Sequence, residues 1–299
     1  MTAEYDFVKA LTGTVLVLLQ RVLPKHLMTR CVYRLARIRI VAVKNWLIKH
    51  FIAVYGVDIG EILAPVPQGF RTFNDFFTRE LAAGARPVDP RPDSVVSPVD
   101  GTVSAAGRIN GETVLQAKGI DYTLTDLLAT DLDDTRDFAD GSFATLYLAP
   151  YNYHRVHCPV GAEIVSVRYV PGQLYSVNET NVSRLPSLFT GNERLVCRFR
   201  TAQGPMILVF VGALHVGSIS TPWSGEIRPR KRGVVEARDL ARSGHSRQLA
   251  RGDLLGWFNM GSTVILLLPE GYCRWQDSMT PGSKLKMGER IACLTKPVS

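Results

Sequence analysis

Residues 195–219 read LVCRFRTAQGPMILVFVGALHVGSI, in which short apolar runs are separated by turn residues. The uncharged region that overlaps them, residues 201–225, is long enough to span a bilayer, which takes about 20 mostly apolar residues. Its Gly, Pro, Ser and Thr residues instead favour buried strands, because these residues interrupt helices and mark turns. The stretch therefore predicts strands at residues 195–199, 206–211 and 215–219.

The same alternation of apolar runs and turns continues on both sides of this stretch. Further strands are predicted at residues 102–106, 113–117, 143–148, 164–170 and 264–268. Residues 97–103 and 221–227 share the form [ST]-P-x-x-G-x-[VI], so we expect the same strand-turn-strand corner twice. These features predict a β-rich body of the barrel or sandwich type.

Helical patterns are confined to a few places. Short helices are predicted at residues 72–79 and 124–129, and at 182–189, where Pro186 weakens the pattern. Longer amphipathic patterns occupy residues 7–23, which end at Pro24, and residues 31–54. The predicted fold class is thus α+β, with N-terminal amphipathic helices on the β-rich body.

Pro65, Pro67 and Gly69 interrupt the N-terminal pattern and predict a boundary near residue 65. Residues 1–65 would then form membrane-docking helices, and residues 66–299 a catalytic domain. The longest uncharged run within the first amphipathic segment, residues 10–20, is too short for a membrane-spanning helix. An acidic start and the lack of a small-residue cleavage site also disfavour a secretory signal.

The positive charge is concentrated in the same N-terminal region. The chain has a formal net charge of +8, whereas residues 7–57 contain nine Lys or Arg and no Asp or Glu, so the remainder carries −1. Basic amphipathic helices without acids are typical of segments that lie on an anionic membrane surface. A helical hairpin packed on its own domain is the main alternative. Nucleic-acid binding is disfavoured, because no recognised nucleic-acid motif is present.

Three short stretches carry residues suited to catalysis: Pro98–Gly101, Tyr153–His157 and Met260–Thr263. A serine hydroxyl needs an imidazole to remove its proton, and a carboxylate to orient that imidazole. Asp100, His157 and Ser262 could fill these roles. Each also has a structural interpretation, since Asp before Gly is common in turns and Gly261-Ser262 could simply precede a strand.

Other chemistries find little support. The chain has no G-x-S-x-G, P-loop, dinucleotide-binding or H-E-x-x-H motif, and its five cysteines form no C-x-x-C pair. The acidic run at residues 131–140 lacks the glycine and final glutamate of a calcium loop, so no metal site is predicted. A second basic stretch, residues 228–251, is interpreted as an exposed loop that could face lipid.

The combination of motifs resembles the pyruvoyl-dependent phosphatidylserine decarboxylase proenzymes, in their membrane-associated bacterial form. The resemblance covers nearly the whole chain and rests on the motifs FNDFFTR, SPVDG, LQAKG, YHRVH, YVPG with SVN, and GSTVI, at residues 73–79, 97–101, 115–119, 153–157, 169–178 and 261–265. The family's processing motif usually has Leu where this chain has Met260. Met keeps nearly the same volume and apolarity, so we expect cleavage to survive.

The resemblance implies that Ser262 attacks the carbonyl of Gly261 and that the chain is cleaved between them. The products would be a large chain, 1–261, and a small chain, 262–299, whose first residue becomes a covalent pyruvoyl cofactor. The resemblance assigns Asp100 and His157 to the relay for cleavage, with His157 as the base. A glycine suits the cleavage site because it leaves its carbonyl open to attack.

The resemblance further implies that the amine of phosphatidylserine forms a Schiff base with the pyruvoyl group and loses CO₂, giving phosphatidylethanolamine. His154 would protonate the product carbon, and residues 169–178 would line the entrance. Expected partners are phosphatidylserine, an anionic membrane surface, the two chains of one proenzyme and a second copy in a homodimer, with no nucleic acid. The expected location is the cytoplasmic side of the cell membrane, as a peripheral protein.

Two other functions remain open at this point. A membrane-bound Ser-His-Asp hydrolase would use Ser262 as a nucleophile on its substrate and would remain a single chain. A non-catalytic basic lipid-binding module would tolerate Ser262→Ala without loss of function.

Overall fold

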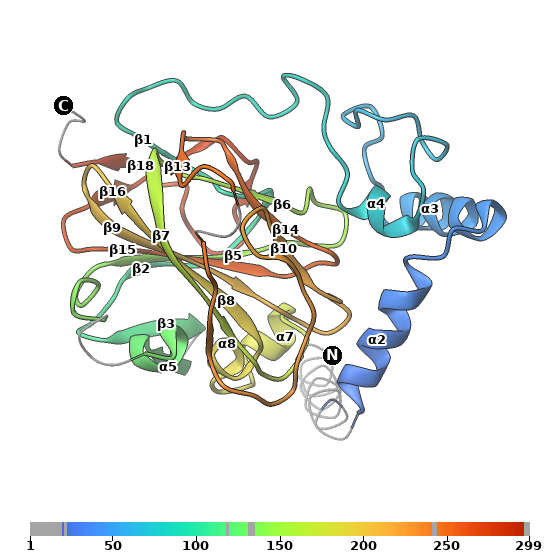
Figure 1. Cartoon of the computed structure of the whole chain (residues 1–299). Coiled ribbons are helices and arrows are strands. Elements are labelled where there is room, and N and C mark those ends of the chain that lie inside the picture. The colour runs from blue at the N-terminus through green and yellow to red at the C-terminus, as the bar shows by residue number, and fades with distance from the viewer. Residues whose placement is uncertain (1–19, 21–22, 118–119, 131–134, 241–243, 296–299) are drawn as a thin grey trace, which may run out of the picture.

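The computed structural model describes residues 20, 23–117, 120–130, 135–240 and 244–295. The predicted amphipathic helix at residues 7–23 therefore lies almost entirely outside the described residues. The described part consists of a β-rich body with helices from the N-terminal region on one side (Figure 1). The predicted α+β class is confirmed.

A nine-stranded antiparallel sheet forms the centre of the body. Its order is β12-β7-β8-β9-β15-β5-β2-β17, and β13 also pairs with β7. The strands are Glu236–Ala237 (β12), Ala162–Val170 (β7), Arg194–Thr201 (β8), Gly204–Val211 (β9), Thr263–Leu268 (β15), Ser142–Tyr147 (β5), Gly101–Arg108 (β2), Lys284–Leu285 (β17) and Gln248–Leu249 (β13).

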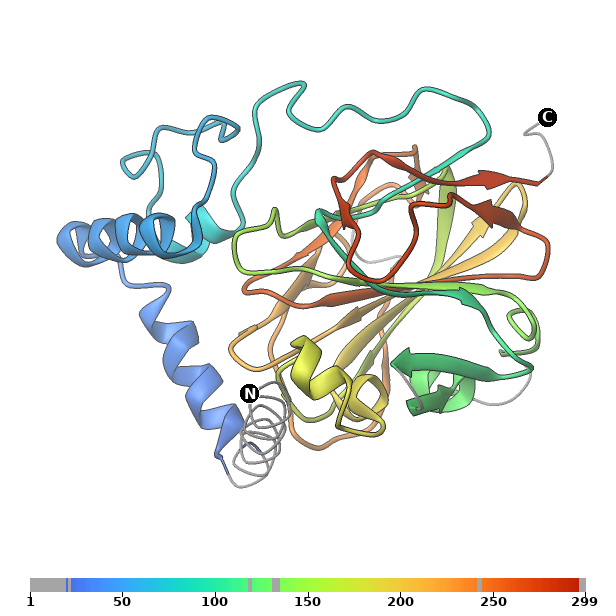
Figure 2. The same cartoon turned by 180° about the vertical axis from the view of Figure 1, so that it is seen from behind.

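Smaller sheets pack around the large one (Figure 2). The four-stranded sheet has the order Gly225–Ile227 (β11), Ile219–Thr221 (β10), Leu254–Phe258 (β14) and Arg155–His157 (β6). The three-stranded sheet has the order Ser94–Val96 (β1), Arg290–Leu294 (β18) and Cys273–Trp275 (β16). The two-stranded sheet pairs Thr113–Ala117 (β3) with Ile120–Thr123 (β4). Among the described strands the large sheet does not close on itself, so the arrangement is a sandwich and not a closed barrel.

Strand β15 occupies the middle of the large sheet, between β9 and β5. All six of its residues, TVILLL, are buried, because sheet neighbours cover both edges and packed layers cover both faces. A continuous apolar run is what a strand buried on both faces requires. The pair Gly261-Ser262 comes directly before this strand, so the fold places it inside the protein.

Three predicted elements differ from the structure. The amphipathic pattern at residues 31–54 is interrupted at residues 36–40, between the helices Lys25–Leu35 (α2) and Val41–Tyr55 (α3). Residues 215–218 were expected to continue a strand, but β10 begins only at Ile219, because His215 (φ 69°) and Gly217 (φ 78°) adopt left-handed conformations that a strand excludes. The helix predicted at 182–189 is two short helices, Glu179–Val182 (α7) and Leu188–Gly191 (α8), with Pro186 between them.

The repeated motif does not form the same corner twice. Residues 221–227 connect β10 to β11, which pair as a hairpin. Residues 97–103 instead lead from β1, in the three-stranded sheet, to β2, in the large sheet. The shared sequence therefore specifies a turn but not the pairing of the strands around it.

The N-terminal helices are Lys25–Leu35 (α2) and Val41–Tyr55 (α3), followed by Phe73–Phe77 (α4); a further helix, Leu124–Leu128 (α5), packs on the body. Helix α2 follows Pro24, α3 ends at Gly56 (φ 64°), and α4 begins with a capping box between Thr72 and Asp75. No helix in the described ranges is long and apolar enough to cross a membrane.

A separate apolar cluster joins α3 to α4 across the predicted boundary at residue 65. Its buried members are Ala36, Ile48, Val57, Ile62, Phe70, Phe73, Phe76 and Phe77. Met260, the residue before the predicted cleavage pair, packs against this cluster. The division at residue 65 stays a prediction.

Candidate functional site

Gly261 and Ser262 lie at the start of β15, beside the end of β5. The amide of Leu148 donates a hydrogen bond to the carbonyl of Ser262 (2.8 Å), which holds the backbone in place. Ser262 is fully buried, and its Oγ has no hydrogen-bond partner among the described residues. A buried hydroxyl without a partner is uncommon and suggests a functional role.

Gly261 has little room for a side chain. A Cβ at this position would lie 3.2 Å from the carbonyl oxygen of Leu148 and 3.3 Å from Cε1 of His154. Both distances are shorter than ordinary van der Waals contacts. Glycine therefore lets the chain pass between β5 and the His154 ring.

His154 lies next to the Gly261-Ser262 pair, fully buried and stacked on Phe77 with ring centroids 4.1 Å apart. Its Nε2 is 3.2 Å from the carbonyl of Pro150, which can only accept, so Nε2 carries the proton. Its buried Nδ1 has no partner in the described part of the chain. Burial, with the charge of Arg79, lowers the pKa of His154 to about 3, so the ring is neutral at neutral pH.

His157 has other neighbours. Its Nδ1 donates to the carbonyl of Gly252 (2.8 Å), and its Nε2 therefore accepts from the hydroxyl of Tyr153 (3.0 Å). Burial lowers the pKa of His157 from its usual value. Both ring nitrogens are thus engaged away from Ser262 and Asp100.

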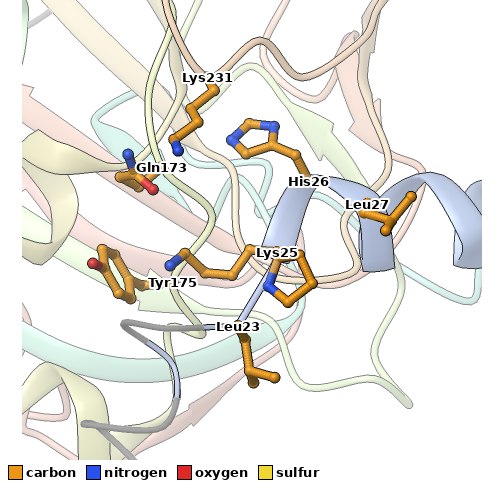
Figure 3. Close-up of a pocket in the computed structure, with 8 residues that line it drawn as sticks. Leu23, Lys25, His26, Leu27, Gln173, Tyr175 and Lys231 are labelled. Carbon is orange, nitrogen blue, oxygen red and sulfur yellow. The ribbon is translucent and has the colours of Figure 1, made fainter.

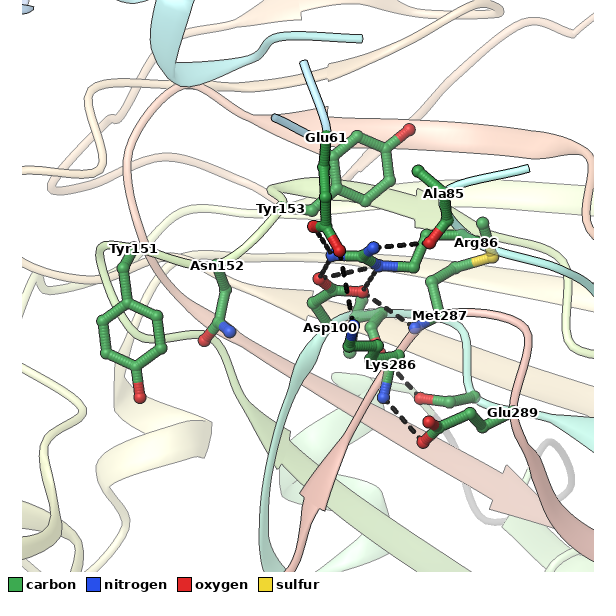
Figure 4. A network of polar contacts seen from close by, with 12 residues as sticks. Glu61, Ala85, Arg86, Asp100, Tyr151, Asn152, Tyr153, Lys286, Met287 and Glu289 are labelled. Atoms are coloured by element: carbon green, nitrogen blue, oxygen red, sulfur yellow. Dashed lines mark hydrogen bonds and ion pairs between the residues drawn. The ribbon is translucent and has the colours of Figure 1, made fainter. Parts of the chain in front are cut away.

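Asp100 belongs to a buried ion network (Figure 4). Arg86 donates to both carboxylate oxygens, with the shortest contact 2.6 Å, and the amide of Met287 donates to Oδ1 (2.8 Å). Arg86 also pairs with Glu61 (2.7 Å), which contacts Lys286 (3.3 Å). Burial lowers the pKa of Arg86, but the hydrogen bonds and charges of Asp100 and Glu61 outweigh it and raise that pKa overall.

The structure thus places His154 beside Gly261, the residue before Ser262. Asp100 and His157 have separate partners. Their backbones are nevertheless adjacent, because the amide of His157 donates to the carbonyl of Pro98 (2.8 Å). A triad in hydrogen-bond contact would require His157 to exchange its bond with Tyr153.

Comparison with known proteins places this constellation in a family. The family model described as phosphatidylserine decarboxylase matches residues 73–293, and a second model, described as PSD, matches residues 15–56. The chain belongs to the phosphatidylserine decarboxylase family. Its match includes the strands around Ser262 and both histidines.

Close similarity to curated members of the phosphatidylserine decarboxylase family extends along 90–95% of the chain. Proteins named phosphatidylserine decarboxylase proenzyme are 44% identical in Azotobacter vinelandii, over 91% of this chain and 95% of the relative. The protein of the same name in Methylococcus capsulatus is 43% identical, over 90% of this chain and 93% of the relative. The one in Hahella chejuensis is 40% identical, over 95% of this chain and 95% of the relative.

Two cavities concern the candidate site, one beside Asp100 and one beside the segment expected at the entrance. The first, of about 390 Å³, opens next to Asp100 and is lined by cations such as Arg86 and by carboxylates such as Glu61. The other, of about 500 Å³, lies between the start of α2 and the segment that contains Gln173 and Tyr175 (Figure 3). Among the described residues that line it, the side chains able to carry charge are Lys25, His26 and Lys231.

Sequence reasoning missed several residues that shape the site. Arg79 is buried, donates to the carbonyls of Tyr151 (3.0 Å) and Asn152 (3.2 Å), and so supports the segment before His154. Burial lowers the pKa of Arg79 to about 10. Arg86 was missed because it lies in an irregular Pro-rich approach whose sequence says nothing about its distant partner Asp100.

Proposed function

We propose that this chain is a proenzyme that cleaves itself between Gly261 and Ser262, acquires a pyruvoyl group at Ser262 and decarboxylates phosphatidylserine to phosphatidylethanolamine. The observation that carries the proposal is the buried Ser262 hydroxyl without a partner, beside His154, at the start of the central strand of a decarboxylase-family protein. Family membership supports the reaction, and the proenzyme name of the relatives supports processing.

The surroundings of Ser262 fit a small planar group at this position. The residue is enclosed, and within the described ranges neither its Oγ nor Nδ1 of the nearby His154 has a hydrogen-bond partner. When formed, the pyruvoyl ketone supplies an electron-withdrawing group that binds the substrate amine and accepts the electrons of the broken bond. The side chains around this buried site would hold the substrate in place.

For the cleavage step, we assign the base to His157 and the supporting carboxylate to Asp100. His157 is neutral at neutral pH, as a base must be, because burial lowers its pKa. To reach Ser262 its Nε2 must leave the hydroxyl of Tyr153. Asp100, fixed by Arg86 and Met287, then provides a stationary negative charge on that side.

We assign His154 to decarboxylation. Its ring contacts the position from which the substrate carbon would approach, and the Phe77 stack and the Pro150 bond fix its orientation. A neutral imidazole is a weak acid, so this geometry favours a role in binding and orientation over proton donation.

The cation-lined cavity beside α2 suits the phosphodiester of the substrate. Lys25 is buried, its Nζ donates to the carbonyl of Gln20 (2.7 Å) and lies 4.2 Å from the Tyr175 ring centre. Burial, aided by the charge of Lys231, lowers the pKa of Lys25, and an anion between these two ammonium groups would relieve their repulsion. Tyr175 belongs to the segment expected at the entrance.

We further propose that α2 and α3 dock the protein on the cytoplasmic face of the cell membrane as a peripheral protein. Nine large apolar side chains between residues 27 and 63 are exposed: Leu27, Leu35, Ile40, Val41, Trp46, Val54, Tyr55, Ile59 and Leu63. Helix α2 buries Lys25 and Thr29 against the body and turns Leu27 and Leu35 outward. A surface helix of a soluble protein usually buries its apolar side chains and exposes its polar ones. Helix α2 does the opposite with these residues, which suits contact with lipid. The homodimer stays a prediction.

Intact mass of the purified protein under denaturing conditions tests the proposal. We expect two chains, 1–261 and 262–299, the smaller one blocked by a pyruvoyl group, and CO₂ release from phosphatidylserine vesicles. The Ser262→Ala variant is the control and should be folded, uncut and inactive. A single unmodified chain that releases no CO₂ would overturn the proposal and favour the hydrolase. Cleavage of Ser262→Ala would overturn the assigned processing chemistry.

A further inference from the structure

Glu193 is a buried carboxyl group that none of the chemistry above uses. It immediately precedes β8 and is fully buried. Its Oε2 accepts a hydrogen bond from the hydroxyl of Tyr169 (2.8 Å), whereas its Oε1 has no partner in the described structure. Burial of a carboxyl group with one oxygen unpaired costs free energy, so such a group needs an explanation.

The strand register places Glu193 close to Ser262. Val211 of β9 pairs with Arg194 on one side and with Thr263 on the other. Gly212 follows Val211, and its amide donates to the carbonyl of Glu193 (2.8 Å). On the other side of β9, Ser262 precedes Thr263, the residue that pairs with Val211. Gly212 therefore lies between Glu193 and Ser262. Their Cα atoms are then roughly 10 Å apart, because paired antiparallel Cα atoms are about 4.5 or 5.5 Å apart.

The absence of a side chain at Gly212 makes room for the side chain of Glu193. A Cβ on Gly212 would lie 2.4 Å from Cγ and 2.7 Å from Oε1 of Glu193. The Glu193 side chain therefore extends across Gly212 toward β15. Residues at the same level of an antiparallel sheet project to the same face. We infer that the side chains of Glu193 and Ser262, each with an oxygen that has no partner among the described residues, lie on one face of the sheet.

We propose that Glu193 is the acid that delivers the proton to the substrate carbon after CO₂ leaves. The bond between the α-carbon and the carboxylate breaks, its electron pair remains with the substrate, and CO₂ departs. The O–H bond of Glu193 then breaks and a C–H bond forms on the α-carbon. Glu193 then regains a proton from solvent, so each turnover consumes one proton. This inference rests on the proposed function.

The hydrogen-bond pattern places the proton on the correct oxygen. Since Tyr169 donates to Oε2, the proton of a neutral Glu193 resides on Oε1, the oxygen that lies over Gly212. Burial raises the pKa of Glu193 to about 8, against smaller opposing effects of Tyr169 and Arg230, so the group is protonated at neutral pH. The amide of Arg230 donates to the Tyr169 hydroxyl (3.0 Å), which connects the pair to the surface ion pair of Arg230 and Glu236.

The contrast with His154 supports this assignment. Burial drives the two groups in opposite directions, since it lowers the pKa of His154 and raises that of Glu193. His154 is therefore unprotonated at Nδ1 at neutral pH, whereas Glu193 carries a proton that it can donate.

The first test measures protonation without activity. In the uncut Ser262→Ala background, infrared spectra should show the carbonyl band of a protonated carboxylic acid at pH 7. Glu193→Gln should remove that band, and raising the pH above about 8 should reduce it. A matched control, Glu163→Gln, changes a carboxylate on β7 that pairs with Arg200 and Arg247, and should leave the band unchanged. An ionised Glu193 at pH 7 would overturn the proposal.

The second test separates cleavage from turnover. Glu193→Gln should still be cut at residue 261, while its kcat for CO₂ release falls by about 100-fold or more, the usual contribution of a general acid. Glu163→Gln should retain full kcat. Full kcat in Glu193→Gln would overturn the Glu193 assignment alone, whereas a parent protein that releases no CO₂ would overturn the proposed function.

A third variant keeps the proposal testable if Glu193→Gln does not fold. Tyr169→Phe removes the hydrogen bond that favours ionised Glu193, so the pKa of Glu193 should rise further. Activity of the parent should decline as the pH rises through about 8, and in Tyr169→Phe this decline should move to higher pH. An unchanged or lower midpoint would contradict the assignment.

Discussion

His154 lies beside Gly261, whereas His157 and Asp100, the proposed base and carboxylate of cleavage, are bonded to other residues. We therefore expect His154→Ala to be cleaved normally but to release CO₂ at least about 100-fold more slowly, because the substrate loses an oriented ring beside the reacting carbon. Intact mass reports cleavage, and CO₂ release from phosphatidylserine vesicles reports turnover. Normal turnover by His154→Ala would remove this residue from the reaction.

Arg86 compensates the buried charge of Asp100. Its side chain is 8% exposed and that of Asp100 6%, so Arg86→Met should leave an unpaired buried carboxylate and reduce the free energy of unfolding by roughly 3–5 kcal/mol. Urea unfolding of the uncut Ser262→Ala chain measures the difference. The control, Arg108→Met, breaks the pair with Glu270 whose side chains are 69% and 66% exposed, and should cost less than about 1 kcal/mol. Equal losses of unfolding free energy in the two variants would show that burial does not determine how much the Arg86–Asp100 ion pair contributes to stability.

Among single residues, those in compact motifs were predictable and those that act through distant partners were not. The YHRVH and GST motifs identified His154 and Ser262, because their types and order carry the resemblance. Glu193 and Arg86 gave no such signal. Their importance depends on Gly212, Tyr169 and Asp100, which only the folded chain brings beside them.

At the scale of elements, the outward apolar face of α3 leads to a binding prediction. Trp46 is 62% and Val54 59% exposed, so replacing both with Ser should weaken binding to phosphatidylglycerol-containing vesicles by about tenfold or more, as apolar burial in the lipid is lost. Co-sedimentation measures the effect. Leu115→Ser, a change of an exposed residue on β3, is the control and should bind as the parent does. Equal binding by all three proteins would argue against docking through α3.

The cavity between α2 and the body leads to a kinetic prediction. Lys231→Gln should raise the KM for phosphatidylserine several-fold with little change in cleavage or kcat, because it removes a charge from the proposed phosphodiester site. Arg39→Gln removes an equal charge from an exposed position near the start of α3 and serves as the control. If both variants shift KM equally, general attraction to the membrane explains the effect and the cavity is not the site.

Elements with a clear period were predicted well from the sequence. The alternation in residues 143–148, 164–170 and 264–268 corresponds to β5, β7 and β15 within two residues at each end. Pairing order was not predictable, since it depends on contacts between distant segments. The orientation of α2 was also hidden, because its pattern shows two faces but not that Lys25 and Thr29 turn toward the body.

At the scale of the molecule, cleavage before β15 would leave the small chain locked in the large one. Strand β15 pairs with β9 and β5, β17 with β2, and β18 with β1, and Met287 bonds to Asp100. We expect the two chains to co-elute in native gel filtration and to separate only in denaturant. Release of the small chain from the cut protein without denaturant would contradict this prediction.

The central position of β15 also limits how long one molecule can work. A cofactor that dissociates can be replaced, but a group that begins the middle strand of the sheet leaves only when the sheet is taken apart. A fresh small chain could not enter, since its hydrophobic strand would have to insert between two paired neighbours. Chemical damage to that group would therefore inactivate the whole protein permanently, and the cell could restore the activity only by synthesising a new polypeptide.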